Sequence, residues 1–288
     1  MQTSQAISIE SARHFYAEEL CRVNRISSPA ILAAFSTVPR ERFVGPGPWM
    51  IQTSGTQFFT ESDDPRNVYQ DALIVLDAAK RLNNGQPSLW AFYLSLLDIH
   101  PGDRILHLGC GAGYYSAILA EITGPLGSVV AVEIDEALAA RARIALGPWP
   151  QVTVIHTNGA QGPFDPADVI VVSAGATHPL PAWLIALKSE GKLLFPLTAT
   201  RGAGTMAYAT RKSANLFAAT LTGTVFFVDF EGARDSVLND ELARALKRDN
   251  GSSVRSLRCD AHEQDASCWL HGRGWCFSRR ATGSAKPE

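Results

Sequence analysis

A glycine-rich loop carries the strongest signal for chemistry in this sequence. Residues Gly109–Gly113 read Gly-Cys-Gly-Ala-Gly and follow the short apolar run Ile105–Leu108. Glycines let the backbone turn sharply and approach a ligand closely. A helix that begins at Tyr114 would present free N–H groups and a dipole that favours a carboxylate or a phosphate. The pattern therefore predicts a strand, a ligand-binding loop and a helix.

An acid at the end of the next expected strand strengthens this prediction. Glu133 lies twenty positions after Gly113, where a carboxylate can accept hydrogen bonds from both ribose hydroxyls of an adenosine-containing cofactor. The plainer interpretation is an ordinary glycine turn followed by a solvated acid. The order of strand, loop, helix, strand and acid favours the cofactor site.

Two classes of cofactor use such a site. Dinucleotides usually require G-x-G-x-x-G, whereas the glycines here alternate and are followed by Tyr114 and Tyr115. This arrangement resembles motif I of the class I methyltransferases, which favours S-adenosyl-L-methionine over NAD. His107 has a second interpretation, as a packed histidine with satisfied hydrogen bonds. The resemblance implies cofactor contacts from His107, Gly109, Cys110, Gly111, Gly113, Tyr114, Glu133, Ile134, Asn158 and Gly159.

The expected elements around the loop alternate between strand and helix. Strands are expected at 104–108, 128–134, 152–156, 168–172 and 192–196, and helices at 114–122 and 136–146. This alternation predicts an α/β fold with a Rossmann-like, doubly wound and mostly parallel sheet.

The flanking segments have other patterns. We expect helices over 9–35 with one break, an irregular loop over 44–70, β-like segments at 205–210 and 216–230, a helix at 237–248 and strands within 254–278. The sequence thus divides into an N-terminal helical arm with a substrate loop (1–98), a cofactor-binding core (99–232) and a C-terminal extension (233–288).

Several segments outside motif I resemble one family in the same order along the chain. The collinear similarity runs over roughly residues 18 to 232, which is more specific than any single motif. The chain resembles the protein-L-isoaspartate O-methyltransferase family. The segments are Val38–Val44 (VPRERFV), Val68–Leu73, Gln86–Ala91, Val171–Ala176, Pro181–Leu184 and Gly191–Leu197.

The family resemblance implies carboxyl O-methylation of an isoaspartyl-type peptide. It implies an acceptor site between the loops Asn83–Ser88 and Ser173–Pro181, with site residues Gly85, Gln86, Pro87, Ser88 and His178. The family's substrate-loop serine falls on Gly85, so backbone N–H groups or Ser88 would bind the acceptor carboxylate. If the pocket is otherwise conventional, Gly85→Ser should raise activity.

The acceptor decides whether a general base is needed. A carboxylate is already ionised at neutral pH and needs only alignment in a water-poor pocket. An amine or hydroxyl would be helped by a base, for which His107, His178 and Asp71 are the candidates. The alternatives are thus a different acceptor on the same scaffold, such as a small metabolite or modified peptide, and a non-catalytic cofactor-binding module.

Composition narrows the partners and the compartment. The 288 residues include 26 basic and 28 acidic side chains, a net charge of -2, which does not favour nucleic acid. No apolar run approaches the ~18 residues of a membrane helix, and Met1–Glu10 lacks a signal-peptide pattern. We expect a cytoplasmic protein with reduced cysteines and a peptide, protein or small-molecule acceptor. The sequence leaves the oligomeric state open.

Cysteine and histidine pairs near the C-terminus raise the possibility of zinc. Cys259-x2-His262 and Cys268-x2-His271 have ligand-like spacing, with Cys276 nearby. The spacer between the pairs has only five residues, shorter than in usual zinc modules, and the alternation over Ser267–His271 fits a plain strand. We therefore expect the extension to be structural and to bind no metal.

Overall fold

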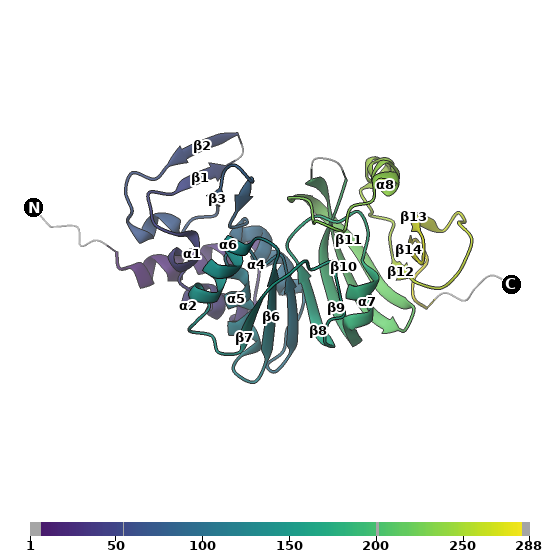
Figure 1. The fold of residues 1–288 in the computed structure, drawn as a ribbon, viewed down its shortest axis with the longest axis horizontal. Coiled ribbons are helices and arrows are strands. Elements are labelled where there is room, and N and C mark those ends of the chain that lie inside the picture. Colours follow the sequence, from purple (N-terminus) through teal and green to yellow (C-terminus); the bar gives the residue numbers. More distant parts are fainter. Residues whose placement is uncertain (1–6, 54, 200–201, 284–288) are drawn as a thin grey trace, which may run out of the picture. The chain divides into compact units, whose positions relative to one another are not determined.

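The computed structural model describes residues 7–53, 55–199 and 202–283, shown in Figure 1. The chain forms two compact units. The first comprises residues up to Asp103 together with Cys110–Ala131 and Asp135–Ile155. The second comprises Arg104–Gly109, Val132–Ile134 and the chain from His156 onward.

Six helices are described in the first unit: α1 (Ile9–Asn24), α2 (Pro29–Thr37), α3 (Glu41–Val44), α4 (Pro87–Leu96), α5 (Tyr114–Thr123) and α6 (Glu136–Ala145). The break between α1 and α2 has local causes. Arg25 adopts the left-handed conformation that ends α1, and Ser28 caps α2 by accepting a hydrogen bond from the Ile31 N–H. The expected pair of N-terminal helices is confirmed.

A small antiparallel sheet in the first unit was not expected. Its strand order is β2-β1-β3-β4, with β1 at Met50–Thr53, β2 at Thr56–Phe59, β3 at Leu73–Asp77 and β4 at Leu82–Asn83; a 3-10 helix, η1, spans Pro65–Val68. The prediction of an irregular loop over 44–70 is therefore wrong for these segments. These strands are short and contain Thr and Gln, so the sequence gives only a weak strand signal. Their pairing also depends on β3, which lies about twenty residues further along the chain from β1. Trp49, Ile51 and Ile74 contribute to the core beneath it.

The main sheet has ten strands in the order β13-β14-β12-β11-β10-β9-β8-β5-β6-β7. Its Rossmann-like part comprises β5 (Arg104–Leu108), β6 (Ser128–Glu133), β7 (Val152–His156), β8 (Ala167–Val172) and β9 (Leu187–Thr198), with α7 (Pro181–Ala186) between β8 and β9. In the second unit β5 pairs with β8 and β8 with β9, both in parallel. The expected α/β, Rossmann-like fold is confirmed. The apolar runs predicted these strands because both faces of a parallel sheet are buried.

The C-terminal part continues the same sheet with antiparallel strands. They are β10 (Ala203–Ser213), β11 (Leu216–Phe226), β12 (Ser256–Arg258), β13 (Cys268–Gly272) and β14 (Trp275–Ser278). The expected amphipathic helix is α8 (Ser236–Asp249), whose N-cap Asp235 accepts from the N–H groups of Val237 and Leu238. The three-way division at 98/99 and 232/233 stays a prediction. No helix among the described residues is long and apolar enough to cross a membrane.

A buried arginine organises the core of the first unit. Arg40 is fully buried, and its guanidinium donates to the backbone carbonyls of Val68, Gln70 and Ala72 at 2.8, 2.7 and 2.7 Å. It also lies 5.9 Å from the ring of Tyr16. One side chain thus satisfies carbonyls that no strand or helix pairs, and fixes the segment that leads into β3.

We predict that Arg40→Met lowers the free energy of unfolding by about 3 kcal/mol or more. The reason is that the buried carbonyls of Val68 and Ala72 lose their donor, each at about 1–3 kcal/mol, while the carbonyl of Gln70 keeps a hydrogen bond from the N–H of Ala72. Urea denaturation followed by circular dichroism measures the change. Arg22→Met is the matched control, because Arg22 pairs with Glu19 on the exposed face of α1 and should change stability by no more than about 0.5 kcal/mol. Equal effects of the two substitutions would contradict the role of Arg40.

Candidate cofactor and acceptor site

The glycine loop has a backbone that only glycine adopts readily. Gly109, Gly111 and Gly113 have φ angles of 75°, 58° and 97°, all in the left-handed region. A Cβ at Gly111 would meet no protein atom within 4 Å, so the backbone there borders open space. Helix α5 follows directly and has no side-chain cap in the described structure. The N-terminus of a helix favours an anionic ligand through its dipole and its backbone N–H groups.

The second unit brings three candidate segments to the carboxyl ends of its strands. The N–H of Gly109 donates to the carbonyl of Val132 at 2.8 Å, and the N–H of Thr157 donates to the carbonyl of Glu133 at 3.1 Å. The N–H of Ser173 donates to the carbonyl of Leu108 at 2.8 Å. The start of the glycine loop, the acid and the loop after β8 thus share one edge, where open α/β sheets bind ligands.

Glu133 ends β6 and is only 6% exposed. Its Oε1 accepts a hydrogen bond from the N–H of Ile134 at 3.0 Å, which holds the carboxylate beside its own backbone. Ile134 is 41% exposed and can cover the apolar face of a ligand. A held carboxylate next to an exposed apolar side chain suits a ribose and its base.

Asn158 and Gly159 form a tight turn after β7. Asn158 Oδ1 accepts from the N–H of Ala160 at 2.8 Å, and Trp183 Nε1 donates to the carbonyl of Gly159 at 2.9 Å. A Cβ at Gly159 would lie 3.0 Å from Phe230 and 3.2 Å from Leu108. A side chain here would therefore need Phe230 and Leu108 to shift slightly. The cofactor contacts expected of both residues stay predictions.

His107 is buried on β5. One ring nitrogen, Nε2, lies 2.8 Å from Ser173 Oγ, and burial lowers the pKa of the imidazole to about 3. The ring is therefore neutral at physiological pH and is bonded to the residue that follows β8. These observations favour the packed interpretation and do not suit a general base, while its contact with the cofactor stays a prediction.

Tyr114 and Cys110 contribute differently from their neighbours in the loop. The hydroxyl oxygen of Tyr114 lies 3.3 Å from that of Tyr16, and its ring packs edge-on against Phe35, so the side chain belongs to the core of the first unit. Cys110 is also buried. Both residues can therefore offer a ligand their backbone rather than their side chains.

The predicted acceptor loop is held by Asp71, which the sequence analysis named only as a candidate general base. Asp71 Oδ1 accepts from the N–H of Ser88 at 2.8 Å, and Asp71 Oδ2 accepts from Gln86 Nε2 at 3.3 Å. Pro87 is the first residue of α4, where proline is favoured. Asp71 therefore caps α4 and fixes Gln86–Ser88. It anchors the loop, and both of its oxygens are engaged.

Gly85 has no room for the family's serine. Its φ is 71°, and a Cβ there would lie 2.8 Å from Trp90 Nε1 and 3.0 Å from Tyr115 Cε2. Tyr115 Oη also donates to the Gly85 carbonyl at 3.2 Å. The expected gain in activity from Gly85→Ser stays a prediction, and this backbone does not favour it, because serine would be strained and would come too close to the indole.

His178 lies in the loop after β8 and has an aromatic partner from the C-terminal part. Its ring stacks on Trp275 of β14, with centroids 6.0 Å apart and an interplanar angle of 14°. Its Nδ1 lies 3.0 Å from Thr177 Oγ1. Burial lowers the pKa of His178, against the opposing charge of Asp235. Sequence reasoning missed Trp275, because nothing in the pattern linked the last hairpin to this loop.

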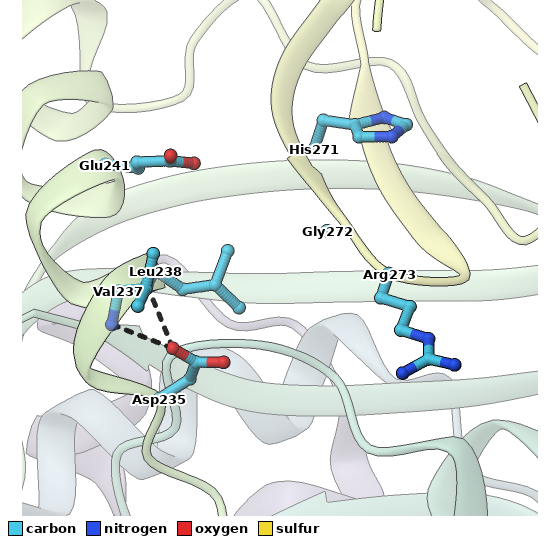
Figure 2. A pocket seen from close by; sticks show the side chains of 7 residues that line it. All are labelled: Asp235, Val237, Leu238, Glu241, His271, Gly272 and Arg273. Carbon is cyan, nitrogen blue, oxygen red and sulfur yellow. Dashed lines mark hydrogen bonds between the residues drawn. The ribbon is translucent and has the colours of Figure 1, made fainter. Parts of the chain in front are cut away.

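The second unit also has an open pocket elsewhere, between the start of α8 and the turn after β13 (Figure 2). Asp235, Glu241, His271 and Arg273 are among its lining residues. It contains none of the residues predicted to bind cofactor or acceptor. The predicted site therefore rests on the glycine loop and the strand ends.

A Rossmann-like sheet, a left-handed glycine loop before a helix and a buried acid at the end of the next strand define a class I S-adenosylmethionine-dependent methyltransferase. The family model for protein-L-isoaspartate(D-aspartate) O-methyltransferase matches residues 15–234. The chain belongs to this family.

Relatives and solved structures agree with this assignment. A protein named protein-L-isoaspartate O-methyltransferase from Methanothermobacter thermautotrophicus is 30% identical over 219 residues, covering 75% of this chain and 93% of the relative. A protein of the same name from Pyrobaculum neutrophilum is 34% identical, covering 66% of this chain and 85% of the relative.

The fold is shared with a solved protein-L-isoaspartate O-methyltransferase at a TM-score of 0.64 and 24% identity, covering 80% of this chain and 69% of the other. It is also shared with a Plasmodium falciparum structure named for the same activity, in complex with S-adenosyl-L-homocysteine. That likeness has a TM-score of 0.62 and 18% identity, covering 76% of this chain and 98% of the other.

The residues present fit S-adenosyl-L-methionine as the cofactor. The open space beside Gly111, the uncapped start of α5 and the buried Glu133 carboxylate match an anionic tail and a ribose. We propose that Gly109–Gly113 and Glu133 hold the cofactor, with Ile134, Asn158 and Gly159 beside its base.

We predict that Glu133→Ala weakens binding of S-adenosylhomocysteine by about 1–3 kcal/mol, because hydrogen bonds to a charged partner are lost. Isothermal titration calorimetry measures the affinity, and circular dichroism checks the fold. Glu136→Ala, which removes an exposed acid three residues further on, is the control and should bind like the parent. An unchanged affinity in Glu133→Ala would rule out the ribose contact.

We predict that Gly85→Ala lowers the free energy of unfolding by more than Gly124→Ala does. The two glycines have nearly equal φ angles of 71° and 70°, but only Gly85 has neighbours within 4 Å of the position that a Cβ would occupy. Gly124→Ala should cost about 1 kcal/mol from the backbone, and Gly85→Ala about 1–3 kcal/mol more from overpacking. Chemical denaturation compares them, and equal losses would show that the loop yields to a side chain.

Proposed function

We propose that this methyltransferase esterifies the free α-carboxylate of an isoaspartyl residue in a peptide or protein. The observation that carries the proposal is the family match, which spans residues 15–234 and so includes both predicted acceptor loops. The names of the relatives point to the same acceptor.

The chemistry asks little of the protein beyond placement. When bound, S-adenosyl-L-methionine supplies an electrophilic methyl group on a sulfonium. A carboxylate acceptor is ionised at neutral pH and needs no base. The chain's own residues therefore bind the acceptor, orient one of its oxygens and exclude water.

The hydroxyl of Ser88 is the side-chain donor we assign to the acceptor carboxylate. Gly85 offers no hydroxyl, and the N–H of Ser88 is already engaged by Asp71. Ser88 lies in the first turn of α4 and is partly exposed. Asp71 fixes the backbone of Ser88 through the Ser88 N–H. The Ser88 hydroxyl therefore starts from a fixed position on α4.

A different acceptor on the same scaffold is the second candidate, and His178 supports it. Of the three candidate bases, His107 is buried and Asp71 has both oxygens engaged. His178 is half-buried, and its lowered pKa keeps the ring neutral near pH 7. A neutral imidazole can take a proton from an amine or a hydroxyl.

We further propose a cytoplasmic setting, which the five free cysteines support.

We expect methyl transfer to a peptide with one isoaspartyl residue and none to the same peptide with normal aspartate. Ser88→Ala should lower kcat/KM for the isoaspartyl peptide by roughly ten- to a hundredfold, the cost of one hydrogen bond to a charged group. Affinity for S-adenosylhomocysteine should not change.

Ser95→Ala is the matched control, because Ser95 lies on the same helix and its hydroxyl donates to the carbonyl of Phe92. It should keep the parent's kcat/KM. If the parent binds S-adenosylhomocysteine yet methylates neither peptide, the isoaspartyl proposal fails and the different-acceptor candidate takes its place. If only the Ser88→Ala result fails, the assignment of Ser88 falls and the acceptor stands.

A further inference from the structure

Four metal-ligating side chains converge in the C-terminal part of the chain. They are His262 from the loop before β13, Cys268 and His271 from β13, and Cys276 from β14. One ligand atom from each lies within 4.8 Å of all the others. Both cysteines are buried, and both histidines are partly buried. Neither the family match, which ends at residue 234, nor the proposed reaction uses these residues.

The separations between the ligand atoms suit a tetrahedral metal centre. Cys268 Sγ lies 3.7 Å from His262 Nε2 and 3.8 Å from His271 Nδ1. Zinc binds sulfur at about 2.3 Å and nitrogen at about 2.0–2.1 Å, so tetrahedral geometry separates such ligands by about 3.6 Å. The side chains therefore already stand at nearly the spacing of bound ligands.

The structure groups the candidate ligands differently from the sequence pattern. The expectation of no metal paired Cys259-x2-His262 with Cys268-x2-His271 across a short spacer. In the structure Cys259 is not part of the cluster, and Cys276 takes its place from the neighbouring strand. The antiparallel register sets His271 opposite Cys276, so the hairpin supplies the geometry that a longer spacer would otherwise provide.

A hydrogen bond outside the cluster holds the His262 ring in the orientation that metal binding needs. His262 Nδ1 lies 2.8 Å from the carbonyl oxygen of Asp260. That bond leaves Nε2, the nitrogen facing Cys268, as the unprotonated ligand atom. Metal-binding histidines usually donate their other N–H to a carbonyl or carboxylate in this way.

A buried cation beside the thiols gives a second, independent indication. Arg258 is 8% exposed, and its guanidinium acts electrostatically on Cys268 and Cys276. Among the described residues its buried Nη1 has no hydrogen-bond partner. Buried donors without acceptors are rare. The guanidinium pairs with Asp260 through Nε and Nη2, and its remaining buried donor would be better satisfied near a thiolate, which accepts hydrogen bonds more strongly than a neutral thiol does.

We propose that His262, Cys268, His271 and Cys276 form a structural zinc site. Two cysteines and two histidines are a donor set that favours zinc, and four protein ligands leave no open position for catalysis. Two thiolates also neutralise the charge of the dication. The proposal stands independently of the acceptor.

The site would fix the hairpin that supports the acceptor loop. Trp275, which stacks on His178, is the neighbour of Cys276 on β14. His271 also lines the open pocket beside α8 (Figure 2), which gives the metal a route from solvent. Zinc would therefore hold β13 and β14 together and keep Trp275 against His178.

The test is elemental analysis of the full chain, purified without a histidine tag or chelator. We expect about one zinc ion per chain. Cobalt replacing zinc in the parent should give the intense visible absorption of a tetrahedral site and a thiolate-to-cobalt charge-transfer band. Removing the metal should speed amide hydrogen exchange in β13 and β14 relative to β8.

Cys276→Ser should weaken zinc binding by more than the roughly 10- to 100-fold caused by loss of an outer partner of a ligand. Cys259→Ser is the matched control, since it removes a nearby cysteine outside the cluster, and it should retain the metal. If Cys276→Ser does not fold, the cobalt spectrum of the parent decides alone. A parent that holds no metal after zinc is supplied, an octahedral cobalt spectrum, a Cys268–Cys276 disulfide in the purified protein, or full zinc retention by folded Cys276→Ser would overturn the proposal.

Discussion

The backbone conformation of the glycine loop is the constraint on which the rest of the site depends. Three left-handed residues in five positions turn the chain from β5 into α5, and side chains at these positions would be strained. At Gly113 a Cβ would also lie 2.8 Å from Leu146, so the close approach of α5 and α6 requires the same glycine. The residue before α5 is Gly113, which makes no side-chain cap hydrogen bond in the described structure. The cofactor-binding edge that we propose rests on this local geometry and on Glu133 at the end of β6.

The acceptor side depends on a different kind of support. Asp71 fixes the start of α4, and the indole of Trp90 together with Tyr115 closes the space above Gly85. The loop packs closely only because residue 85 has no side chain. A serine at this position would require Trp90 and Tyr115 to move. In the second unit Trp275 supports His178. The C-terminal part therefore contacts the predicted acceptor loop through Trp275, in addition to extending the sheet.

Features set by neighbours in sequence could be predicted, and features set by distant partners could not. The glycine loop, the break before α2 and the apolar strands β5 and β8 each carry their signal within a few residues. The hairpin of β1 and β2 was missed, because its short polar strands depend on β3. The site residues stay predictions from motif and family. The structure adds what the sequence could not show: Asp71 as a cap, His107 bonded to Ser173, and Cys276 rather than Cys259 beside His262.

The chemical nature of the transferred methyl bond tests the central claim most directly. A purified sample of the full chain is incubated with labelled S-adenosyl-L-methionine and an isoaspartyl peptide, and the product is analysed by tandem mass spectrometry and by its stability in mild alkali. If the isoaspartyl carboxylate is the acceptor, we expect a methyl group on it that alkali releases as methanol, because the product is an ester. A methyl group that survives alkali on an amine or hydroxyl, with none on the carboxylate, would contradict it.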